Sequence, residues 1–265
     1  MTMAATAQTR GTAPQQARGG GLIGAVAAEW TKLWGLRSTW LCLVVAVLAT
    51  AGTAALAGLA LTASDSGDTP AANTLAIVST LLSQFAVVAV AALAVTGEYA
   101  TGAMRTTLTT VPRRGRMLIA KIAVLAVATF AAGCAAGAAT IAVTAGVFGD
   151  SVTYGTASVL HGVVGVGGYL MGLALFTLGL GLLMRSTAGA ITTVVGVVLA
   201  VPMISQMVRN DTVTDIVNHM PAMAGTPLMT GADDPYGWGM GSLLLVGWAA
   251  LSLVLGYVAL SRRDA

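Results

Sequence analysis

The chain has 265 residues, of which 56% are hydrophobic and only 9% are charged. Charged residues make up about a quarter of a typical soluble domain, so this composition excludes a water-soluble globule, and the mean hydropathy of +0.84 indicates a protein of the lipid bilayer. The net charge of +3 is not accompanied by a basic, aromatic-rich soluble surface, so no nucleic-acid partner is expected.

The first residues predict a cytoplasmic tail followed by a helix at the inner membrane surface. Residues 1–21 are rich in Ala, Thr, Gln and Gly and lack apolar periodicity, so we expect a disordered tail before a single domain over 22–265. Helical spacing then places one set of apolar residues on a common face, with Glu29 and Lys32 on another. That apolar set is Leu22, Val26, Trp30, Leu33 and Trp34. We expect an interfacial helix over 22–36; an amphipathic helix packed on a partner protein is the alternative.

Six long stretches without charge follow. A helix needs about 20 apolar residues to cross the hydrocarbon layer, and each stretch is long enough for one crossing and too short for two. Open strands would leave backbone groups unpaired in lipid, so the spans must be helices. The sequence therefore predicts an all-α, polytopic membrane protein with spans at about 40–61, 74–96, 122–147, 159–184, 187–208 and 238–260.

Polar and small residues within the spans predict how the helices meet. Span two carries Ser79, Thr80, Ser83 and Gln84, which we expect to form hydrogen bonds between helices. The glycines of spans three and four predict close helix packing, although a bend in span four is an open alternative. They are Gly133 and Gly137 in span three, and Gly162, Gly165, Gly167, Gly168, Gly172, Gly179 and Gly181 in span four.

The loop between spans five and six, residues 209–237, is long enough to hold structure of its own. Thr212 and Asp215 resemble a capping box, and Val213, Ile216 and Val217 lie on one apolar face. We expect a short helix that dips into the outer surface or lies along it.

The basic residues predict the orientation. Twelve of the thirteen Lys and Arg residues fall on one side of the predicted membrane, and only Arg209 lies on the other, together with seven of the ten acidic residues. Basic loops remain in the cytoplasm. We therefore expect a multi-pass protein of the plasma membrane with both termini and the loop between spans two and three in the cytoplasm.

That loop, within "TGEYATGAMRTTLTTVPRRGRMLIAK" (96–121), holds most of the internal basic charge. Glu98, Gly102 and Arg105 punctuate a short helical run that ends near Leu108, and Pro112 then breaks it. A helix standing out from two spans is suited to transmit an external push. The alternative is that the arginines only fix the topology and bind anionic lipid.

Several kinds of chemistry are excluded by the residues that are missing. Neither of the two lysines, Lys32 and Lys121, is followed by the Ser or Thr of a phosphate-binding loop, so the chain is not expected to hydrolyse ATP. No Asp, Glu, Lys, Arg or centrally placed His interrupts a predicted span, which argues against ion coupling. The two histidines are not placed for an intramembrane serine protease. Cys42 and Cys134 lie in predicted spans, and no metal or cofactor is expected.

Two segments resemble a known family. "AAEWTKLWGLRSTW" (27–40) and "GEYATGAMRTTLTTVPRRGRMLIAK" (97–121) are similar to the corresponding segments of bacterial ABC-type-2 transporter permeases, and the six-span pattern fits them over about 22–263. The chain departs from the family pattern at Ala103 and Met104, where a Thr followed by Leu or Ile is frequent.

The resemblance implies a transport subunit without a catalytic site. Two permease copies, identical or paired with a sibling, would work with separate ATP-binding subunits and contact membrane lipids while exporting a substrate that the sequence does not identify. The coupling helix that docks on the ATPase would include Glu98, Tyr99, Gly102, Arg105, Thr106 and Leu108. A basic cluster at the inner surface would comprise Arg113, Arg114, Arg116 and Lys121, and the connecting helix would carry Glu29, Trp30, Lys32 and Arg37. The loop over 209–237 would form short re-entrant helices.

A function from a different class also fits the spans. An integral-membrane immunity or interaction protein would bind lipid or a peptide without moving it, and it would need no ATP-binding partner.

Overall fold

The computed structural model describes residues 21–63, 72–102, 114–149, 155–208 and 210–262, and every regular element in them is helical. Within these ranges six helical spans are long and apolar enough to cross a membrane, which confirms the number of spans predicted. Four spans are each a single long helix: α2 (Arg37–Ala63), α3 (Ala72–Ala100), α5 (Arg114–Phe148) and α12 (Trp238–Arg262). The fourth span joins α6 (Thr156–Leu160), the π-helical turn η2 (His161–Gly165) and α7 (Val166–Met184); the fifth joins α8 (Thr187–Val195), the π-helical turn η3 (Gly196–Ala200) and α9 (Val201–Met207).

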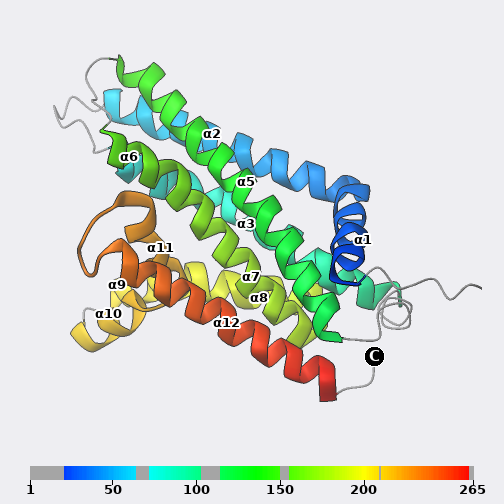
Figure 1. Ribbon diagram of the computed structural model, residues 1–265. Helices are drawn as coiled ribbons and strands as arrows, with labels where there is room; N and C mark the ends of the chain where they lie inside the picture. Colours follow the sequence, from blue (N-terminus) through cyan, green and yellow to red (C-terminus); the bar gives the residue numbers. More distant parts are fainter. Residues whose placement is uncertain (1–20, 64–71, 103–113, 150–154, 209, 263–265) are drawn as a thin grey trace, which may run out of the picture.

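The spans form a bundle with two different ends (Figure 1). The short helix α1 (Gly21–Gly35) crosses one end, here called the α1 end. Helices α10 (Asp211–Asn218) and α11 (Pro221–Thr230) lie at the other, here called the α11 end. The Lys and Arg residues of the described ranges lie on α1 or near the helix ends that Figure 1 shows beside it: Lys32, Arg37, Arg114, Arg116, Lys121, Arg185 and Arg262.

Helix α7 lies at the centre of the bundle, where it packs against α3, α5 and α12. Its span is the most buried of the six. Glycines permit this closeness: a Cβ added at Gly133 of α5 would lie 2.7 Å from the Cα of Gly167, and one added at Gly137 would overlap the carbonyl oxygen of Gly162. The prediction that these glycines pack closely is therefore confirmed. Two of them, Gly162 and Gly165, lie in the π-helical turn η2.

Two of the polar residues predicted to join span two to its neighbours do so. The Ser79 and Thr140 hydroxyl oxygens lie 3.1 Å apart, which links α3 to α5. The Tyr169 hydroxyl donates to Gln84 Oε1 at 2.6 Å, which links α7 to α3. Thr80 and Ser83 instead donate to carbonyl oxygens of α3 itself, so their side-chain hydrogen bonds do not join helices.

The long loop forms two helices. The side chain of Asn210 accepts a hydrogen bond from the Val213 amide and caps α10, so the predicted capping by Thr212 is wrong. Helix α11 is largely buried and packs against α12 and η2, where His161 Nδ1 lies 3.0 Å from the Leu228 carbonyl oxygen. Helix α11 thus packs among the helices of the spans at this end of the bundle.

Candidate functional site

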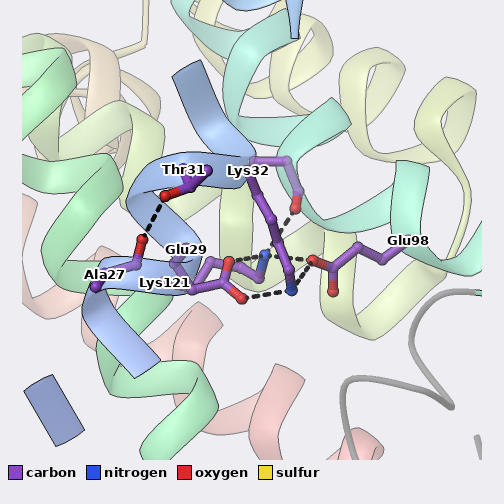
Figure 2. A network of polar contacts seen from close by, with 7 residues as sticks. Ala27, Glu29, Thr31, Lys32, Glu98 and Lys121 are labelled. Carbon is purple, nitrogen blue, oxygen red and sulfur yellow. Dashed lines mark hydrogen bonds and ion pairs between the residues drawn. The ribbon is translucent and has the colours of Figure 1, made fainter. Parts of the chain in front are cut away.

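Four charged side chains from three helices meet at the α1 end (Figure 2). Glu29 and Lys32 come from α1, Glu98 from the last turn of α3, and Lys121 from the third turn of α5. We call this group the charge cluster. It contains every glutamate and every lysine of the chain, although these residues are separated by up to 92 positions.

Lys121 is the centre of the charge cluster. Its Nζ donates to Glu29 Oε2 at 2.6 Å, to Glu98 Oε1 at 3.0 Å and to the Ala94 carbonyl oxygen at 3.0 Å. These bonds use all three hydrogens of an ammonium group. Lys121 is only 4% exposed, and a charge so deeply buried is stable only when it is paired in this way.

Lys32 completes the ring of ion pairs from the more open side. Its Nζ lies 2.8 Å from Glu29 Oε1 and 3.1 Å from Glu98 Oε1, and its side chain is 42% exposed. The two lysines thus bridge the same two carboxylates. As a result α1 is bound by charge to both α3 and α5.

The cluster shifts the titration of the two residues on α1. Burial by itself would raise the pKa of Glu29, but the charges and hydrogen bonds of Lys121 and Lys32 outweigh burial, and the pKa is lowered from 4.5. Burial would likewise lower the pKa of Lys32, but Glu29 and Glu98 outweigh it, and the pKa is raised from 10.5. Both residues therefore remain charged over a wide range of pH.

The structure shows which face of α1 packs on the bundle. The buried face carries Ala25, Glu29 and Leu33, while Leu22 and Trp30 are exposed. The sequence predicted that Glu29 and Lys32 lie on a different face from the apolar residues, but it did not predict that Glu29 packs on the bundle. Glu29 is buried nevertheless because two lysines compensate its charge. Trp30 and its neighbours Trp34 and Trp40 form a chain of ring contacts with centroids 5.6 and 4.4 Å apart.

The described members of the predicted basic cluster lie in different surroundings. Lys121 is buried between α5, α1 and α3, where it belongs to the charge cluster. The guanidinium Nη1 of Arg114 donates to the carbonyl oxygens of Leu260 and Ser261 at 2.6 and 3.1 Å. A cation there stabilises the carboxyl end of α12. Arg116 is exposed, as is Arg37 at the start of α2, and Arg113 lies outside the described residues.

Part of the predicted coupling helix also lies outside the described residues, including Arg105, Thr106 and Leu108. Of the remainder, Glu98 belongs to the charge cluster and Gly102 is exposed with a left-handed φ of 70°. The Tyr99 ring lies under the Arg185 guanidinium, 5.1 Å from ring centroid to Cζ. This contact, which the sequence did not indicate, joins α3 to the end of α7.

The charge cluster was missed as a unit because its pairs are distant in sequence. Glu29 and Lys32, three residues apart on a helix, were a visible local pair. For Glu98 and Lys121 the available signal was composition. Eleven of the thirteen basic residues are arginines, and the chain has only two lysines and two glutamates, which pair with one another in the charge cluster.

Comparison with known proteins assigns no family to the chain. No model of a known protein family matches it, and no significantly similar protein was found among curated proteins.

Proposed function

We propose that this multi-pass membrane protein is the permease subunit of an ATP-driven exporter of the ABC-type-2 class, working with separate ATP-binding subunits at the α1 end. The observation that carries the proposal is the charge cluster, which ties α1 to the end of α3 and the beginning of α5. The segment between those two helices, 97–116, is the proposed contact with the ATPase. A push on this segment would reach α3 and α5 directly and α1 through the cluster.

The packing of the bundle supports transmission beyond the α1 end. Helix α3 packs on α7, and α7 packs on α12 and on α11. Arg185 of α7 also contacts Tyr99 next to the cluster. ATP can drive a change of conformation only through contacts that differ between two states. Ion pairs between separate helices, unlike bonds within one helix, are contacts that can differ in this way.

The experiment begins with the full-length tagged chain purified from its native membranes in a mild detergent. We expect an ATP-binding subunit to co-purify and the complex, but not the isolated chain, to hydrolyse ATP. A cysteine introduced by Asp233→Cys, exposed at the α11 end, reports on the far side of the bundle. Its labelling rate is expected to change when ATP is added to the complex.

Variants then test the route. Glu98→Ala and Arg105→Ala are expected to abolish the ATP-dependent change at position 233 while leaving membrane insertion intact. Arg262→Ala removes an exposed charge from the same end and is expected to retain the change. The permease proposal would be rejected if no ATP-binding subunit were recovered, or if ATP did not change the labelling rate at position 233 in the wild-type complex. Either result would favour the immunity or interaction protein.

A further inference from the structure

A cavity of about 410 Å³ opens beside the charge cluster, between α1, α3 and α5. This volume lies within the range of about 300–1,000 Å³ typical of small-molecule sites. Beyond the four charged residues, most of its lining is apolar: Leu33, Leu36, Leu93, Ala94, Val124 and Leu125. A molecule that fills it must therefore have a large apolar part and a polar head that reaches the cluster.

The hydrogen bonds of the cluster specify that head. Both oxygens of Glu29 accept hydrogen bonds from lysines, and Glu98 Oε1 accepts from Lys32 and Lys121. Glu98 Oε2 is buried and accepts none from the described residues (Figure 2). A buried carboxylate oxygen without a donor is costly. The unmet requirement is thus for an N–H or O–H donor, and a charged donor satisfies a carboxylate best.

We propose that the cavity binds a membrane phospholipid with an ethanolamine headgroup. Its primary ammonium would donate to Glu98 Oε2, one acyl chain would lie along the apolar lining, and its phosphate would face Lys32 at the more open side of the cluster. Charge complementarity selects this occupant. A fatty acid would bring a second carboxylate to Glu98, and a choline headgroup carries a cation but no N–H donor.

The site shares the charge cluster with the proposed transport function, but lipid binding there does not depend on that function. A lipid bound there would brace α1 against α3 and α5 whether or not the chain works with an ATPase. The test below uses the purified chain alone, so its failure would leave the permease proposal untouched, and the loss of the ATPase partner would leave the lipid site untouched.

The test measures lipid retained by the full-length chain, purified in detergent with equal amounts of phosphatidylethanolamine and phosphatidylcholine that carry identical acyl chains. Mass spectrometry of the intact protein counts each bound lipid. We expect the ethanolamine lipid to be retained about tenfold over the choline lipid, because a hydrogen bond to a charged group contributes on that order. Equal retention of the two lipids, or retention of neither, would overturn the proposal.

Two variants locate the site. Glu98→Gln removes the carboxylate charge and is expected to bring the ratio of the two lipids close to one. Leu93→Trp fills the cavity from a residue that is 37% exposed and outside the charge cluster, so the ion pairs are kept. This variant tests the proposal even if Glu98→Gln does not fold. It is expected to lose the preferentially bound lipid, whereas Val254→Trp, on the exposed side of α12, is expected to keep it. Wild-type retention by Leu93→Trp would place the lipid elsewhere and refute the proposal.

Discussion

At the scale of single residues, the charge cluster makes two buried carboxylates depend on one lysine. Lys121 contacts both Glu29 and Glu98, whereas the other bridging residue, Lys32, is partly open to its surroundings. In a buried pair most of the energetic consequence appears when one partner is removed, because the remaining charge is left without compensation. Lys121 should therefore be the least replaceable member.

Replacement of Lys121 by Met, which has a similar length and no charge, tests this dependence. We expect the free energy of unfolding to fall by about 3–5 kcal/mol, the cost of breaking a buried ion pair, and the midpoint of thermal unfolding in detergent to fall with it. Arg262→Met removes an exposed charge at the same end and is expected to change little. Adding Glu29→Gln to Lys121→Met should recover part of the loss; no recovery would mean that the carboxylate was not the source of the instability.

The pH dependence of stability follows from the direction of the pKa shifts. A carboxyl group whose pKa is lowered on folding contributes stability above its unfolded value, and loses that contribution as the pH falls through the folded pKa. For Glu29 the contribution is present above about pH 4.5 and lost below it. For Lys32 the pKa is raised, so the contribution is present below about pH 10.5 and lost as the pH rises further.

Glu29→Gln separates this effect from the general response of the protein to acid. We expect the difference in unfolding midpoint between wild type and Glu29→Gln to be largest near neutral pH and to shrink as the pH falls below 4.5. A difference that stays constant from neutral to acidic pH would contradict the pairing of Glu29 in the folded state. The measurement is a series of thermal unfolding curves in buffers of matched ionic strength.

At the scale of elements, the sequence predicts the spans well, and every predicted end except the start of span three lies within four residues of the observed helix end. The charge-free stretches locate all six spans because the bilayer excludes unpaired charge. The same rule predicts a start for span three after Lys121, whereas α5 begins at Arg114. Lys121 lies inside the helix because partners from α1 and α3 compensate it, and pairs between distant segments leave no local pattern. The burial of Glu29 in α1 was not predicted for the same reason.

The glycine contacts of α5 provide a prediction with an internal control. A Cβ at Gly137 would overlap the Gly162 carbonyl oxygen, whereas one at Gly146 meets nothing within 4 Å. Gly137→Ala is therefore expected to force α5 from η2 and to lower the free energy of unfolding by about 1–3 kcal/mol. Gly146→Ala should be neutral or stabilising by up to about 1 kcal/mol, since Ala is the better helix former. Equal unfolding midpoints for the two variants would contradict the close approach of these helices.

At the scale of the whole molecule, charge distinguishes the two ends of the bundle. The basic residues of the described ranges lie at the α1 end, while Asp211, Asp215, Asp233 and Asp234 lie at or next to α10 and α11. Because basic segments are retained in the cytoplasm, we predict an orientation with the charge cluster inside. The proposed contact with an ATP-binding subunit requires this orientation, because ATP is available on that side.

Cysteine labelling in intact cells tests the orientation. In a background with Cys42→Ala and Cys134→Ala, Thr101→Cys marks the α1 end and Ala232→Cys marks the α11 end, both at exposed positions. A maleimide that cannot cross the membrane is expected to label position 232 in intact cells and position 101 only after permeabilisation. Thr212→Cys, exposed on α10, should behave as position 232 does. Labelling of position 101 from outside would show the opposite orientation. The charge cluster would then lie outside the cell, where no cytoplasmic partner could reach it.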